Sequence, residues 1–262
     1  MTPTSFDKND MTFRCDLSGA NYGEMKDLRP DLVVLPWGAI EPHNLHLPYL
    51  TDALLAADIA RDAATLAHQR YGHRCVVMPA MPLGSHNPGQ FDLPFCIHFR
   101  QETQAAVFRD VVRSLHRQGV RKIVIINGHG GNLFKGFIRD LAFECPDLLV
   151  AAGEWYRAAD PKAFFDRPGD HADELESSVM MHYHPELVDL TEAGAGTSTG
   201  FRDPMLRDGT VWIPRDWSRI SRDSGVGDPR GATAEKGAAF ARACAEAYAG
   251  LFHRLITEPL YE

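Results

Sequence analysis

Four side chains that can bind a metal lie close together near the start of the chain. Glu41, His43, His46 and Asp52 closely follow the apolar run at residues 32–35. Carboxylate oxygens and imidazole nitrogens are common ligands of divalent metals. Glu41 and His43 are two residues apart, so their side chains leave the same side of an extended backbone. We therefore predict that this segment opens a metal site.

Two members of this group have alternative roles. Asp52 precedes an Ala-rich segment with helical spacing of its apolar residues, where a carboxylate could equally be a plain N-cap. His46 has a weaker case, and we interpret it as a residue behind the site or as a substrate contact. Read alone, the sequence around Asp52 leaves both roles open.

Two later segments offer further ligands. The sequence NGHGGN at residues 127–132 places His129 among small residues, which let other groups approach its ring closely. The sequence DHADELESS at residues 170–178 contains His171 and Glu176 at the expected start of a helix. An isolated histidine is more often structural, but the position after a buried strand favours His129 as a ligand.

Other acidic residues of the third segment fit a structural role. Asp173 and Glu174 lie in the expected first helical turn, where negative charge complements the helix dipole. We interpret these two as part of a solvated helix start, and we keep only His171 and Glu176 as site residues.

The segments that carry these groups alternate between strands and helices. Short apolar runs predict buried strands at residues 31–36, 75–78, 122–126 and 148–152. Apolar spacings of three to four predict helices at residues 53–70, 101–118 and 232–256, after residue 132, and before Pro185. This order predicts an α/β fold with a mostly parallel sheet covered on both faces, in which ligands sit beyond the carboxyl ends of the strands. The irregular segment at residues 190–231 is long enough to be a functional loop that covers the site.

Composition limits the class of protein. The 262 residues suit a single domain over 1–262, and the net charge of −8 without clusters of Lys and Arg argues against nucleic acid as a partner. No run approaches the roughly 18 apolar residues of a membrane span, and the first thirty residues lack an apolar core. The five cysteines are far apart and are expected to be reduced. We expect a cytoplasmic protein without a membrane partner.

The joint pattern of the three segments resembles the creatininase (creatinine amidohydrolase) family over nearly the whole chain. The residues that carry the resemblance are Gly38, Glu41, His43, 46–48, 51–52, 127–132, 171–172, 176–178, 227–229 and 232–237. The resemblance implies a creatininase-like three-layer α/β/α sandwich, a homo-oligomer that is frequently a hexamer, and hydrolysis of a carbon–nitrogen bond in a small-molecule amide. It also implies two divalent metal ions, zinc first, with manganese or iron as alternatives.

The resemblance assigns a role to each candidate ligand. Asp52 would bridge the two ions, Glu41 and His129 would bind one ion, and His43 and Glu176 would bind the other. Two metals that share a carboxylate lower the pKa of a bridging water from about 15.7 towards 7 and polarise the attacked carbonyl. No serine or cysteine nucleophile is then required.

The remaining site residues would act on the substrate. His171 would be the general acid and base that passes a proton to the departing nitrogen, and we count Glu176 with it as catalytic. Trp155 stands where creatininase has an aromatic residue after a strand, so we predict that it contacts substrate. Asn87 in the irregular loop after the second strand and His46 are the other predicted substrate contacts.

Departures from the family pattern argue against creatinine itself as the substrate. Gly131 stands where creatininase has a further metal-binding Glu, and Arg167 with Pro168 occupies the region of a second tryptophan. Within the same fold, the alternatives are a formylamino-pyrimidine nucleotide deformylase and a hydrolase of modified peptides. A phosphate group would need cations, and candidates are Arg202, Arg207, Arg215, Arg219 and Arg222. The alternative from another class is a non-catalytic metal-dependent binding or scaffold protein.

Overall fold

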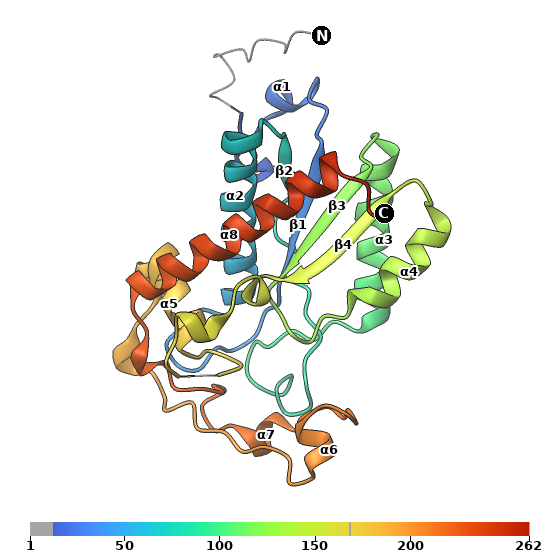
Figure 1. Ribbon diagram of the computed structural model, residues 1–262. Coiled ribbons are helices and arrows are strands. Elements are labelled where there is room, and N and C mark those ends of the chain that lie inside the picture. Colours follow the sequence, from blue (N-terminus) through green and yellow to red (C-terminus); the bar gives the residue numbers. More distant parts are fainter. Residues whose placement is uncertain (1–12, 168, 262) are drawn as a thin grey trace.

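The computed structural model describes residues 13–167 and 169–261 (Figure 1). Residues 1–12, Pro168 and Glu262 lie outside the described part, and with them part of the N-terminal stretch that supports the expectation of a cytoplasmic protein. Among the described residues, no helix combines the length and the apolar character needed to cross a membrane.

A four-stranded parallel sheet lies at the centre of the fold, with strand order β2-β1-β3-β4. Its strands are β1 (Leu32–Trp37), β2 (Cys75–Val77), β3 (Lys122–Asn127) and β4 (Leu149–Glu154). The central strands β1 and β3 are almost entirely buried, which explains why both read as uninterrupted apolar runs. Trp37 pairs with Asn127, and Asn127 pairs with Glu154, so three strands end at the same level.

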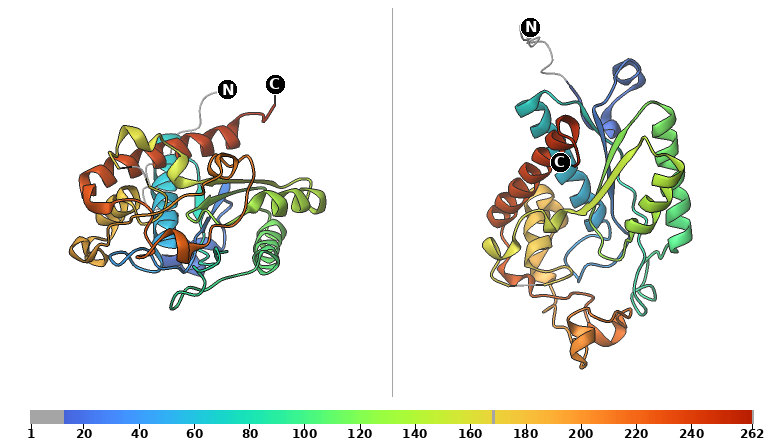
Figure 2. Two further views of the ribbon diagram at one scale, coloured as in Figure 1. Left: turned by 90° about the horizontal axis from the view of Figure 1, so that it is seen from below. Right: turned by 45° about the vertical axis from the view of Figure 1, so that its right-hand side comes forward.

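Helices cover both faces of this sheet (Figures 1 and 2). One layer contains α2 (Thr51–Tyr71), α5 (Glu174–Tyr183) and α8 (Ala234–Thr257), and the other contains α3 (Gln101–Arg117) and α4 (Phe134–Glu144). Side chains alternate along β1, because Val34 packs with the first layer whereas Val33 and Leu35 pack with the second. The predicted three-layer α/β/α sandwich is confirmed, and all four strands are parallel.

The start of α2 decides the role that the sequence leaves open for Asp52. α2 begins at Thr51, two residues before its expected start, so Asp52 lies in the first helical turn. The N-cap residue is Leu50, which makes no side-chain capping hydrogen bond. The N-cap interpretation of Asp52 is therefore wrong, and its buried carboxylate lies at the ends of the strands.

The start of α5 differs from the expected solvated helix end. Asp173 is the N-cap, and its Oδ1 accepts a hydrogen bond of 3.0 Å from the backbone N–H of Glu176. Glu174 is fully buried, accepts two backbone N–H groups of the preceding loop, and lies 2.5 Å from Nζ of Lys236. The sequence could not indicate this ion pair, because its partners lie 62 residues apart.

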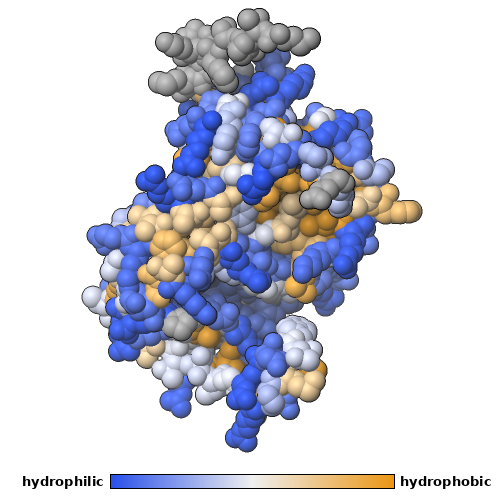
Figure 3. Space-filling view, viewed as in Figure 1, coloured by the Kyte–Doolittle hydropathy of each residue, from blue (hydrophilic) through white to orange (hydrophobic). Residues whose placement is uncertain are grey.

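The segment of residues 190–231 is largely irregular, as expected. Its short helices are α6 (Pro204–Arg207) and α7 (Trp217–Ile220), and a further short helix, α1 (Tyr22–Met25), precedes β1. The segment lies beyond the carboxyl ends of the strands (Figure 1). In the space-filling view from the same side, the surface is hollowed between this segment and the three layers (Figure 3).

The close contact between α8 and α5 generates a stability prediction. A Cβ at Gly237 in α8 would lie 1.9 Å from the carbonyl oxygen of Ser178 in α5, which is rigid backbone. Gly237→Ala should therefore reduce the free energy of unfolding by about 1–3 kcal/mol, measured by urea denaturation. The control Gly250→Ala in the same helix meets only the flexible end of Arg254 and should be neutral or stabilising by up to ~1 kcal/mol. Equal stability of the two variants would contradict this account of the helix contact.

Candidate metal centre

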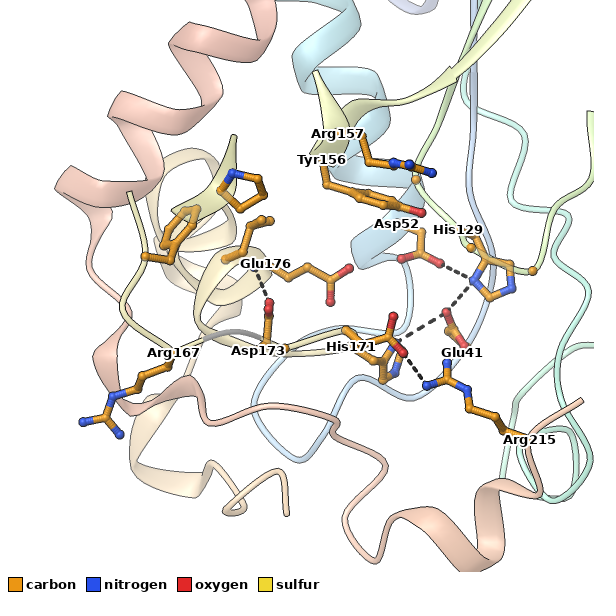
Figure 4. Close-up of a pocket in the computed structure, with 18 of the residues that line it drawn as sticks. Glu41, Asp52, His129, Tyr156, Arg157, Arg167, His171, Asp173, Glu176 and Arg215 are labelled. Carbon is orange, nitrogen blue, oxygen red and sulfur yellow. Dashed lines mark hydrogen bonds and ion pairs between the residues drawn. The ribbon is translucent and has the colours of Figure 1, made fainter. Parts of the chain in front are cut away.

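Four parts of the chain bring titratable side chains to the carboxyl end of the sheet (Figure 4). Glu41 and His43 follow β1, Asp52 lies in the first turn of α2, His129 follows β3, and Glu176 lies in the first turn of α5. All five side chains are buried. The structure thus brings together the five residues that were expected to bind metal.

Two glycines allow the start of α2 to lie directly against the ends of β1 and β3. A Cβ on Gly38 would lie 2.3 Å from the backbone nitrogen of Ala53, and a Cβ on Gly128 would lie 2.3 Å from the carbonyl oxygen of Asp52. Any other residue at either position would push α2 away from the sheet. The close approach holds the Asp52 carboxylate between the loops that follow the two strands.

The two oxygens of Asp52 contact different histidines. Oδ1 lies 3.0 Å from Nε2 of His43, and Oδ2 lies 3.1 Å from Nδ1 of His129. Nδ1 of His129 also lies 2.8 Å from Oε1 of Glu41. Nε2 of His43 also lies 3.9 Å from Oε2 of Glu176. The cluster therefore consists of two half-sites that share one carboxylate.

Backbone carbonyls fix the orientation of both imidazoles. Nδ1 of His43 lies 3.1 Å from the carbonyl oxygen of Glu41, and Nε2 of His129 lies 2.8 Å from that of Ser85. A carbonyl oxygen only accepts, so each of these nitrogens carries a hydrogen. The other nitrogen of each ring faces Asp52 and can present a lone pair, as in metal-binding histidines.

The donor set fits a metal better than it fits a closed hydrogen-bond network. Oδ2 of Asp52 is buried and, although it lies 3.1 Å from Nδ1 of His129, it makes no well-aligned hydrogen bond among the described residues. Lone pairs of carboxylate oxygens and imidazole nitrogens face one another here, which is unfavourable unless positive charge lies between them. In the described part of the chain, three groups of side chains have the spacing to hold an ion, namely Glu41, His86 and His129; Glu41, His43 and His171; and His43, Asp52 and Glu176.

Protons can supply that positive charge when no metal is bound. Burial alone would lower the pKa of His43, but Asp52 and Glu176 raise it to about 10. Burial would also lower the pKa of His129, but Glu41 and Asp52 raise it well above its usual value. Burial raises the pKa of Glu176 to about 8 and outweighs the opposite effect of His43. The metal-free cluster therefore holds protons at neutral pH.

His171 lies beside the cluster with no carboxylate at hydrogen-bond distance. Its Nε2 lies 2.8 Å from the carbonyl oxygen of Pro42, and its Nδ1 lies 3.9 Å from Oε1 of Glu41. The ring of Trp217 packs edge-on against it, with 5.3 Å between ring centroids. Burial, and then the neighbouring His43, lower the pKa of His171. The ring is therefore neutral at neutral pH, with a lone pair on Nδ1.

A cavity of about 1060 Å³ opens above the cluster. The titratable residues at its base are Glu41, Asp52, His129, His171 and Glu176. Its walls come from the loop after β4 and from the segment of residues 190–231, which contributes Trp212, Arg215 and Trp217. Part of the segment that was expected to cover the site therefore forms one of its walls.

Comparison with known proteins identifies the family. Residues 17–252 match the profile of the creatininase family, which is described as creatinine amidohydrolase. The chain belongs to the creatininase family. A relative from Mycobacterium ulcerans (strain Agy99), named mycofactocin precursor peptide peptidase, is 31% identical over 214 residues, which cover 78% of each chain.

Solved structures of the creatininase family share the fold. A crystal structure from Bacteroides fragilis NCTC 9343, of a protein provisionally named a creatinine amidohydrolase, is 55% identical, with a TM-score of 0.93 over 96% of this chain and 100% of that one. A manganese form of creatininase is 22% identical, with a TM-score of 0.76 over 93% and 99% of the two chains. A Zn-Zn form of a creatininase variant is similarly related. The creatininase fold expected from the resemblance is confirmed.

The three residues expected to contact substrate lie in different surroundings. Asn87 lines the cavity. Trp155 does not belong to the lining but to the core, where it packs against Phe240 with 6.1 Å between ring centroids. His46 also lies outside the lining, with its Nε2 2.7 Å from the hydroxyl of Ser177. The position of His46 favours a role behind the site. Trp155 packs in the core and not on the cavity wall, so the prediction that it contacts substrate is not supported.

Sequence reasoning missed three residues around the cluster. Tyr156 lines the cavity in place of its neighbour Trp155, because a 3-10 turn follows β4 and breaks the alternation of the strand. Gln90 donates a hydrogen bond to Oε2 of Glu41, and Nδ1 of His86 lies 3.3 Å from the same oxygen. Both come from the irregular loop between β2 and α3, where no periodicity indicates which side chains point inward.

The protonated state of the metal-free cluster predicts proton release when metal binds. Metal binding needs neutral imidazoles and an ionised Glu176, so it should displace on the order of three protons per chain at pH 7, and affinity should fall as the pH is lowered. Calorimetric titration with Zn²⁺ in buffers of different ionisation enthalpy measures this number. His43→Gln should release fewer protons than wild type, whereas His98→Gln in the neighbouring loop should not differ. Binding heats that do not depend on the buffer would contradict this description.

Proposed function

We propose that this protein is a dinuclear metal-dependent amidohydrolase that cleaves a carbon–nitrogen bond of an amide. Glu41 and His129 would hold one divalent ion, His43 and Glu176 the other, and Asp52 would bridge the two. The observation that carries this proposal is the position of Asp52, whose two oxygens each face one histidine. Zinc and manganese are the ions we propose, because both occur in creatininases of this fold, with iron as an alternative.

The ions and the protein have separate tasks in this proposal. When bound, two ions that share a carboxylate lower the pKa of a water between them and polarise the amide carbonyl. The chain holds the ligands rigidly, because Asp52 lies on a helix that is packed against two strand ends and Glu176 accepts a 2.6 Å hydrogen bond from the N–H of Ala172. Such fixed ligands need little rearrangement during the reaction.

We assign His171 the role of general acid and base. Its Nε2–H is held by the carbonyl of Pro42, which leaves Nδ1 facing the cavity beside Glu41. A neutral imidazole in this position can accept a proton at Nδ1 from the attacking water and deliver it to the departing nitrogen. Glu176 assists as a buried ligand that faces the same cavity.

Among amide substrates, the dimensions of the cavity favour a peptide over a small cyclic amide. A volume of about 1060 Å³ lies at the upper end of the range for sites that hold drug-sized ligands, roughly 300–1,000 Å³. The wall adds exposed apolar surface at Trp212 and cations at Arg157 and Lys162. The name of the Mycobacterium ulcerans relative also refers to a precursor peptide. Hydrolysis of a modified peptide is therefore our second, narrower candidate.

The deformylase alternative receives less support. Of the five arginines considered for a phosphate group, Arg215 lines the cavity and the other four do not. Arg215 is already engaged, since its Nη1 lies 2.5 Å from Oδ2 of Asp170 and its guanidinium lies over Trp217. A nucleotide phosphate would have to compete with Asp170 for this cation or bind Arg157 or Lys162 on the same wall.

Hydrolysis by the metal-loaded protein tests the proposal. The panel contains creatinine, small cyclic and linear amides, N-formyl compounds and short modified peptides, each with added Zn²⁺ or Mn²⁺. We expect turnover of at least one amide other than creatinine. Asp52→Ala should lose most of the bound metal together with activity, whereas His171→Gln should keep the metal and lower kcat by about 10²–10⁴-fold.

A matched control is available on the same helix. Asp62→Ala in α2 removes a carboxylate that accepts a 2.6 Å hydrogen bond from the hydroxyl of Tyr183, away from the cluster. It should keep both the metal and the activity. Full metal occupancy without activity on any member of the panel would instead favour a metal-dependent binding or scaffold protein, and retention of two ions by Asp52→Ala would contradict the bridging role.

A further inference from the structure

We propose that His86 is an additional ligand of the ion held by Glu41 and His129. The inference rests on the proposed function for the existence of that ion, but it adds a ligand from a loop that supplies no member of the proposed set. This half-site would then have four protein ligands, namely Glu41, His129, the shared Asp52 and the added His86.

The geometry of His86 carries this inference. Its side chain is fully buried, and its Nδ1 lies 3.3 Å from Oε2 of Glu41. Apart from this contact with Glu41, the nitrogen has no polar partner at hydrogen-bond distance among the described residues. The ring lies 4.9 Å from that of His129, measured between centroids. Ligand atoms of Glu41, His86 and His129 all lie within 4.8 Å of one another, so one ion could contact all three.

His86 is built in the same way as the other histidines around the cluster. Its Nε2 lies 3.2 Å from the carbonyl oxygen of Ile97, so that nitrogen carries a hydrogen and Nδ1 can present a lone pair. His43, His129 and His171 likewise have one nitrogen on a backbone carbonyl and the other directed at a carboxylate. A hydrogen bond of this kind fixes the tautomer and orientation of metal-binding histidines.

Two simpler roles explain the position of His86 less well. As an imidazolium it could donate to Glu41, but Oε2 of Glu41 already accepts a hydrogen bond from Gln90, so a second donor is not required. As a substrate contact it would have to reach the cavity, but it is not part of the lining. A buried nitrogen close to both a ligand carboxylate and His129 suits a metal better than either.

The loop that carries His86 is held firmly enough to position a ligand. The backbone N–H of His86 donates to Nδ1 of His98 at 3.0 Å. The N–H of Phe99 donates to the carbonyl of Gly84 at 2.8 Å, and the N–H of Ile97 donates to that of Ile40 beyond β1 at 3.1 Å. These bonds attach both ends of the loop to each other and to the segment that carries Glu41.

A crystal structure of the zinc-loaded wild-type protein, with ions located by anomalous scattering, tests the inference without a substitution. We expect Nδ1 of His86 about 2.0–2.1 Å from the ion beside Glu41 and His129. An ion in that half-site with Nδ1 of His86 more than about 3 Å away would overturn the inference and leave the proposed function intact. Absence of any ion in the cluster would overturn both.

Metal affinity provides the second measurement. His86→Gln keeps an amide that can donate to Glu41 but removes the imidazole, so it should weaken binding of one of two Zn²⁺ ions at least about 10-fold, measured by competition with a chelator. It should also change the visible spectrum of the Co²⁺-loaded protein, which reports the ligands directly. His98→Gln, which can still accept the N–H of His86, is the matched control and should change neither. Unchanged affinity and an unchanged Co²⁺ spectrum in His86→Gln would contradict the inference.

Discussion

Three carboxylates, Glu41, Asp52 and Glu176, are buried together with two inward-facing imidazoles, and the structure around them depends on neutralising this cluster. A buried carboxylate is costly unless it is paired. Protons on His43 and His129 provide the positive charge in the metal-free chain, as the raised pKa values of both rings indicate. Two divalent cations would provide it more completely, because Oδ2 of Asp52 lies 3.1 Å from Nδ1 of His129 but makes no well-aligned hydrogen bond among the described residues.

The fold supplies the rigid frame that this arrangement needs. Strands β1, β3 and β4 end at one level, so the loops that follow them open on the same side of the sheet. Gly38 and Gly128 let α2 approach two of those strand ends closely enough to place Asp52 between them. On the other side, Gly237 lets α8 lie against α5, whose first turn carries Glu176. Small residues at helix contacts therefore set the distances between ligands.

Much of this could be predicted from the sequence. The alternation of apolar runs and helical segments predicts the parallel sheet, and parallel strands bring the loops after β1 and β3 to one edge. Each of the five proposed ligands lies directly after a strand or in the first turn of a helix, positions that a pattern can locate. The family resemblance then added roles to individual residues, and the homohexamer that it implies stays a prediction.

The rest depends on contacts that no local pattern encodes. Tyr156 lines the cavity instead of Trp155 because a 3-10 turn follows β4, and strand alternation does not predict where this turn begins. His86 lies in a loop without periodicity, and its direction is set by a hydrogen bond to the carbonyl of Ile97. Glu174 is buried through its contact with Lys236, far along the chain. Long-range pairs and irregular loops thus mark the limit of inference from sequence here.

In the metal centre that we propose, Asp52 joins two ions. Electron paramagnetic resonance of the protein loaded with two Mn²⁺ per chain tests it most directly, because ions about 3.5–4 Å apart that share a carboxylate are magnetically coupled. We expect the spectrum of a coupled pair, which changes to that of isolated Mn²⁺ when the loading falls well below one ion per chain. The spectrum of isolated Mn²⁺ at full loading would contradict it.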